Sequence, residues 1–138
     1  MTTMSVTLTT QEKATVRTAA YGAVSLLAAA GGATGKPHKI ATTGTIALSS
    51  ATGVVGHVLA EKSGRIALSG SSVAELADQV LPALTAAMSL LGRHDPVEAE
   101  NFRNTIAVAI DTTQLYQTRP NPTMVDMTRK ITGALDAA

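Results

Sequence analysis

The sequence predicts an all-α fold: a single-domain bundle of about five helices around a central helix that is rich in small residues. Three observations predict it. Apolar residues recur at spacings of three and four in several separate stretches, as one face of a helix requires. Helix-start signals precede three of these stretches. Two are a Ser or Thr with Glu three residues later, and one is an Asp directly before Pro. Residues 40–60 contain no Asp, Glu, Lys or Arg, and a helix without a charged face is typically buried on most sides.

Composition narrows the class of protein. The chain has 138 residues, which suits one domain, and a formal charge of +1 from 11 basic and 10 acidic residues. The absence of Cys excludes disulfides, thiolate zinc sites and Cys nucleophiles, and it fits a reducing compartment. Without clustered Lys and Arg or aromatic stacking platforms, no nucleic-acid partner is expected. No signal-peptide pattern opens the chain, so we expect a cytoplasmic protein.

The first helix is predicted to begin at Thr9, after a flexible N-terminal tail at residues 1–8. Thr9 and Glu12 form a capping box, in which each side chain accepts a hydrogen bond from the other residue's backbone amide. The helical domain is expected to span 9–138. The helix should end near Ala30, before two glycines, and its inner face carries Val16, Ala20, Ala23, Val24 and Leu27.

The predicted central helix begins at Pro37, which suits a first helical turn, and ends at Ser63 and Gly64. It keeps three glycines, each costing about 1 kcal/mol against Ala in a helix. Close approach to a neighbouring helix would offset that cost, so we expect one unbroken helix. A break near 49–53, where Ser, Thr and Gly cluster, is the alternative. A transmembrane hairpin of 18–35 and 40–60 is a more remote alternative, because both runs are poor in Leu, Ile and Phe.

Three more helices follow an extended connector at 65–70. Ser72 and Glu75 start a helix whose apolar spacing continues through Pro82, which predicts one helix kinked there. Asp95 and Pro96 start the next helix, which runs to about Gln117 with Phe102, Ile106, Ala109, Ile110 and Thr113 on its inner face. Asp111 is expected on its outer face. The last helix should run from about Thr123 to Asp136, with Met124, Met127, Ile131, Ala134 and Leu135 facing inward.

The loop 31–36 resembles a phosphate-binding loop only superficially. The first Gly of that motif would fall at Ala30, and Pro37 stands where a magnesium-binding Ser or Thr is needed. A weaker possibility is anion binding by free amides at the start of the next helix, with Lys36, His38 and Lys39 nearby.

His57 and Glu61 stand four residues apart, and therefore on one helical face. That spacing serves acid–base pairs and metal half-sites, but two ligands do not make a metal site, so neither a metal nor a cofactor is predicted. The simplest interpretation is a structural hydrogen bond. The functional alternative is a small-ligand pocket near His57, Glu61 and the Pro82 kink, with Lys36 and His38 as further candidate ligand-binding residues.

Small residues line two predicted helices and permit close helix–helix contact. They are Ala19, Ala20, Gly22 and Ala23 in the first helix, and Gly44, Ala47 and Ala51 in the central one. If either face stays exposed because no other helix of the chain covers it, we expect that face to form a homodimer interface. With no catalytic constellation in the sequence, we expect a non-enzymatic protein-interaction or self-assembly module, with an unknown protein partner.

Overall fold

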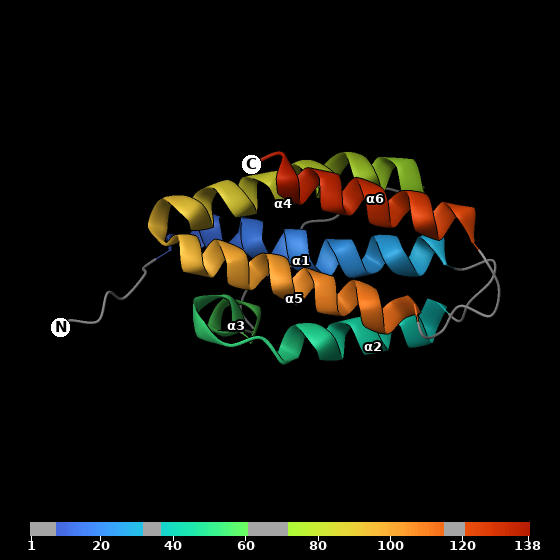
Figure 1. The fold of residues 1–138 in the computed structure, drawn as a ribbon, viewed down its shortest axis with the longest axis horizontal. Helices are drawn as coiled ribbons and strands as arrows, with labels where there is room; N and C mark the ends of the chain where they lie inside the picture. Colours follow the sequence, from blue (N-terminus) through green and yellow to red (C-terminus); the bar gives the residue numbers. More distant parts are fainter. Residues whose placement is uncertain (1–7, 32–36, 61–71, 115–120) are drawn as a thin grey trace.

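The computed structural model describes residues 8–31, 37–60, 72–114 and 121–138, and within these residues the chain forms six α-helices and no strand. The helices are α1 (Thr10–Ala30), α2 (Pro37–Ser49), α3 (Gly53–Ala60), α4 (Val73–His94), α5 (Pro96–Gln114) and α6 (Pro122–Asp136). The all-α prediction is confirmed. Figure 1 shows three layers, with α4 and α6 in the first, α1 and α5 in the middle, and α2 and α3 in the third.

The central helix is α1, which packs against each of the other five described helices. Its close approach to neighbours depends on small residues. A Cβ added to Gly22 would lie 2.6 Å from Val80 Cγ2 of α4, and one added to Gly44 of α2 would lie 2.8 Å from Val24 Cγ1 of α1. The small-residue faces of α1 and α2 are thus used inside one chain, where all of their members except the half-buried Ala51 are buried.

The prediction that residues 37–60 form the central helix is wrong. α2 contacts α1, α3 and α5, and its outer side is exposed at Thr42, Thr45, Ile46 and Ser49. Threonine and serine are polar, so they allow this face of α2 to be exposed to water although residues 40–60 carry no Asp, Glu, Lys or Arg. The Thr45 hydroxyl donates to the Ala41 carbonyl (2.8 Å), and the Ser49 hydroxyl donates to the Thr45 carbonyl (2.9 Å). Counting charges alone therefore overestimated the burial of this segment.

The prediction of one unbroken helix over 37–60 is also wrong, and the alternative break near 49–53 is observed. α2 ends at Ser49 and α3 begins at Gly53, which has a positive φ of 69°. A Cβ on Gly56 would lie 2.2 Å from the Ala51 carbonyl oxygen. Gly53 and Gly56 therefore serve a turn and not helix packing, because the left-handed conformation and the backbone contact both favour a residue without Cβ.

Local helix-start signals are confirmed. The capping box of Thr9 and Glu12 is formed in both directions, at 2.9 and 3.0 Å. The Ser72 hydroxyl accepts from the Glu75 amide (3.1 Å), and α4 continues through Pro82 to His94. The Asp95 carboxylate accepts from the Val97 amide (3.0 Å) at the start of α5.

The predicted inner faces of α1, α5 and α6 form the core, where Ala134 alone among the named residues is half-buried. Leu8 is buried at 5% exposure, so the prediction of a flexible tail is wrong at this residue. Residues 1–7 and the predicted connector 65–70 lie outside the described residues. Asp111 is exposed as expected.

Several helix ends are held by side chains from other helices. The Tyr21 hydroxyl of α1 donates to the Leu59 carbonyl of α3 (2.8 Å). The Thr85 hydroxyl of α4 donates to the Ala134 carbonyl of α6 (2.7 Å). Asn121 caps the start of α6, and its amide also donates to the Ala30 carbonyl of α1 (3.0 Å). Each bond satisfies a backbone group that the helix itself leaves without a partner.

No helix within the described residues combines the length and the apolar character that crossing a membrane requires.

Candidate functional site

Two of the four residues that the sequence proposed as a ligand site lie within the described part of the chain, on different helices. His57 lies exposed in the last turn of α3, and His38 lies in the first turn of α2. Glu61 and Lys36 lie outside the described residues. Pro82 lines a different hollow of about 410 Å³ between α1 and α4, to which His57 does not contribute. The ligand pocket near His57 and Glu61 stays a prediction.

Two adjoining hollows form a groove between α5 and the turn that joins α2 to α3. Their volumes are about 420 Å³ and about 190 Å³, and they share Thr52, Asn101 and Asn104. We call this surface the α5 groove. It is lined by Ser50, Ala51, Thr52, Gly53, Val97, Glu98, Glu100, Asn101, Asn104, Thr105 and Val108.

Hydrogen bonds from α5 hold the inner wall of the α5 groove in place. The Glu98 carboxylate accepts from the Val55 amide of α3 (3.2 Å) and from the Asn101 side-chain amide (3.3 Å). The Asn101 amide also donates to the Thr52 carbonyl (2.8 Å). α5 thus supplies a cap for α3 from a distant part of the chain. The turn at 50–52 forms one wall of the groove, and its bond to Asn101 of α5 holds it in place.

The side chains that face solvent along the α5 groove are apolar at both ends and polar between. Val97 is 70% exposed and Val108 is 47% exposed. Asn104, which lies between them, has an exposed amide without a hydrogen-bond partner among the described residues. Among the described residues, no Lys or Arg lines either hollow, whereas Glu98 and Glu100 do. The arrangement offers apolar contact and amide hydrogen bonds to an elongated neutral or basic molecule.

Another hollow, of about 470 Å³, lies where α4, α5 and α6 meet. Met88, Ala99 and Leu135 give it an apolar floor, and Arg93 and Arg103 stand at its edge. The Arg103 guanidinium pairs with Asp136 and donates to the Leu135 carbonyl (3.4 Å), so it holds the end of α6. Arg93 makes no ion pair within the described residues.

The exposed pair of Glu12 and His94 joins the start of α1 to the end of α4, with 3.3 Å between a carboxylate oxygen and Nε2. The hydrogen bond from the Thr9 backbone amide, followed by the interaction with His94, lowers the pKa of Glu12 below its ordinary value of 4.5. The sequence identified the capping role of Glu12 but not its contact with His94, because the two are far apart in the chain. The pair stabilises a junction of two helices and lies apart from the α5 groove.

Within the described ranges, no three His, Asp or Glu side chains come close enough to hold a metal ion. Val97 and Val108 are the surface residues that sequence reasoning missed. The signal was present, since neither valine belongs to the inner face defined by Phe102 and Ile106. No protein-family model, curated protein or solved structure matches the chain.

Proposed function

We propose that the chain is a non-enzymatic protein-interaction module, and that it binds a segment of another protein in the α5 groove. The observation that carries this proposal is the exposure of Val97 and Val108 at the two ends of one groove with a polar centre. Interfaces combine apolar anchors with a few directed hydrogen bonds, and the groove supplies both.

Burial of apolar surface, hydrogen bonding and a preorganised backbone all favour binding in the α5 groove. Burying a fully exposed Val side chain contributes about 1.5–3 kcal/mol, and Val97 is 70% exposed. The Asn104 amide adds a donor and an acceptor that give orientation. The wall at 50–52 is already pinned by Asn101 and Glu98, so little conformational freedom is lost when a partner binds.

Peptide selection tests the proposal. A display library of random peptides is selected on the whole chain, and the enriched peptides are then measured against Val97→Glu and Val108→Glu. We expect both changes to abolish or strongly weaken binding, since each puts a charge where an apolar side chain should be covered.

Val125→Glu is the matched control, because Val125 is an equally apolar residue of α6 that is 54% exposed and lies outside the groove. Enriched peptides should bind this variant like the unchanged chain. If no peptide is enriched, or if the enriched peptides bind all three variants equally, the groove is not an interaction site.

A second candidate function, small-ligand binding, is favoured by the hollow between α4, α5 and α6. Its volume of about 470 Å³ exceeds the ~300 Å³ that marks the low end of ligand pockets. Native mass spectrometry of the purified chain checks it: a retained mass that Met88→Trp displaces would support this site. If neither the unchanged chain nor the Met88→Trp variant retains any added mass, the result would count against this site.

A further inference from the structure

We infer that the partner of the α5 groove is a basic amphipathic helix whose cationic side chains pair with Glu100 and Asp111. This inference rests on the proposed function and adds the chemistry of the partner. It follows from a row of exposed residues on α5, from the sign of the charges along that row, and from the type of backbone that the surface can accept.

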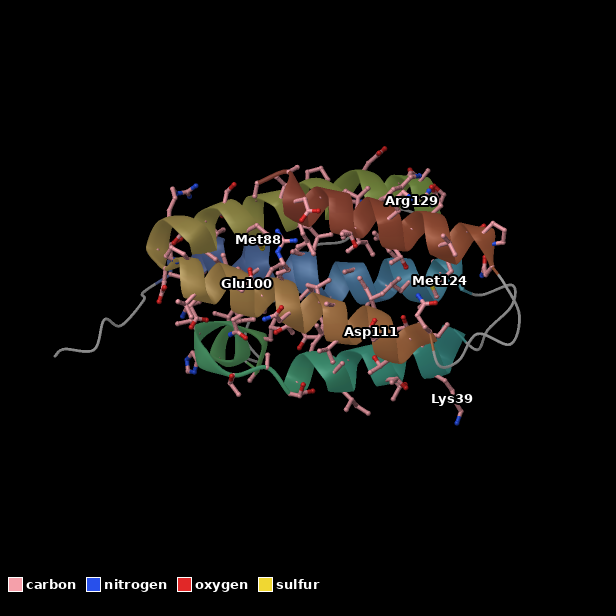
Figure 2. The ribbon with its side chains drawn as sticks, viewed as in Figure 1. Lys39, Met88, Glu100, Asp111, Met124 and Arg129 are labelled. Carbon is pink, nitrogen blue, oxygen red and sulfur yellow. The ribbon has the colours of Figure 1, made fainter. Side chains whose placement is uncertain are left out.

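The row consists of Glu100, Asn104, Val108 and Asp111, which follow one another at spacings of four, four and three along α5 and are all exposed. Residues at such spacings lie on one side of a helix. Figure 2 shows Glu100 and Asp111 on α5, toward opposite ends of the helix. At 1.5 Å of rise per residue, they are about 16 Å apart along the axis.

The row is acidic at both ends, at Glu100 and Asp111, and is uncharged between them. Glu100 lines the groove together with Glu98 and forms an ion pair with Arg103, whose Nε lies 3.9 Å from the Glu100 carboxylate. Arg103 also pairs with Asp136, so one guanidinium is shared between two exposed acids. Asp111 makes no ion pair within the described residues. A partner with one cation near each end complements this pattern, whereas an acidic partner would be repelled.

A helix is the backbone that fits such a surface. The described surface has no strand edge that could pair with an extended peptide, so recognition depends on side chains. Two acids separated by three turns, with Val108 between them, match a ridge of side chains on a second helix packed alongside. The partner therefore carries Lys or Arg at the spacing of Glu100 and Asp111, and an aliphatic side chain between the two cations that covers Val108.

Fluorescence anisotropy with designed peptides tests the inference. The probe is an alanine-based helical peptide of about 15 residues with Lys at the spacing of Glu100 and Asp111, Leu between them, and a fluorescent label. A second peptide carries Glu in place of both Lys. We expect the whole chain to bind the lysine peptide and not the glutamate peptide, with an affinity that falls as salt is added.

Charge reversal on the protein makes the test specific. Glu100→Lys and Asp111→Lys should each raise the dissociation constant for the lysine peptide by about two- to tenfold, the range for exposed ion pairs that turn repulsive. The double variant should prefer the glutamate peptide. Asp78→Lys, which reverses an exposed acid on α4, is the control and should leave both affinities unchanged.

The outcomes separate this inference from the function on which it rests. If groove-dependent peptides emerge from selection without cations, or if the lysine peptide binds all variants equally, the basic-helix inference is overturned while the interaction module stands. If no peptide depends on Val97 or Val108, both fail. Preference of the double variant for the glutamate peptide establishes the pairing with Glu100 and Asp111.

Discussion

Gly56 and Gly133 are both helical glycines, yet the space around them differs completely. A Cβ on Gly56 would lie 2.2 Å from the Ala51 carbonyl oxygen, a backbone atom that cannot rotate away. Around Gly133 of α6, no atom of the described residues lies within 4 Å of the added atom. The two residues therefore form a matched pair for testing the turn between α2 and α3.

We expect Gly56→Ala to lower the free energy of unfolding by about 1–3 kcal/mol, because the turn must shift to admit the methyl group. Gly133→Ala should raise it by about 0.5–1 kcal/mol, since alanine loses less conformational entropy in a helix. Urea denaturation followed by circular dichroism measures both. A neutral Gly56→Ala would mean that the turn adapts freely and does not form a fixed wall of the groove.

Glu12 gives the stability of the chain a pH dependence at the acidic end. Its pKa is lowered in the folded state, first by the bond from the Thr9 amide and then by His94. A carboxyl group whose pKa is lowered by folding stabilises the fold at pH values above its unfolded pKa, near 4.5. That stabilisation is lost as the pH falls through the lower pKa of the folded state. We expect Glu12→Gln to lower Tm at pH 7 and to leave Tm little changed well below pH 4.5. Equal Tm differences at both pH values, in calorimetry, would contradict the assignment.

At the scale of the element, α3 depends on a cap that comes from α5. The Glu98 carboxylate accepts from the Val55 amide and is held by Asn101. We expect Glu98→Ala to lower the free energy of unfolding by about 1–2 kcal/mol, as loss of a helix cap does. Hydrogen exchange followed by mass spectrometry should locate the loss of protection in 53–60.

Glu100→Ala, which removes a neighbouring acid that caps no helix, is the control for this prediction. It should leave exchange in 53–60 unchanged. Loss of protection spread evenly over α1, α4 and α6 would instead mean that Glu98 stabilises the whole fold and not α3 in particular.

The elements that could be predicted are those whose signals are local. Thr9, Ser72 and Asp95 each start a helix by bonding to an amide two or three residues away, so the pattern is visible in a short window of sequence. The break between α2 and α3 was harder to predict. It is held by Glu98 and Asn101, more than forty residues further along the chain, and a propensity argument about glycines could only offer it as an alternative.

At the scale of the molecule, the layer order and the α5 groove could not be read from the sequence. Residues 40–60 lack charge, but exposed Thr and Ser side chains solvate one side of α2, and α1 takes the central position. The exposure of Val108 follows from its place opposite the inner face of α5. Its neighbours in the groove, however, come from the turn at 50–53, which only the folded chain brings beside α5.

The whole molecule should be a monomer in detergent-free buffer, because the small-residue faces proposed for a homodimer are buried within one chain. Size-exclusion chromatography with light scattering measures this directly. A dimer that Val108→Glu converts to a monomer would assign the α5 groove to self-assembly. A dimer that Ile46→Glu disrupts instead would place the contact on α2, where Ile46 is 64% exposed.

The central position of α1 has a consequence for synthesis. α1 is synthesised before the other five described helices, yet it contacts each of them, including α6, which is the last of the six to be made. At ~5–20 residues per second, the side of α1 that α6 covers waits on the order of ten seconds for its partner. Truncation before α6 should therefore leave uncovered the side of α1 that α6 contacts in the folded chain.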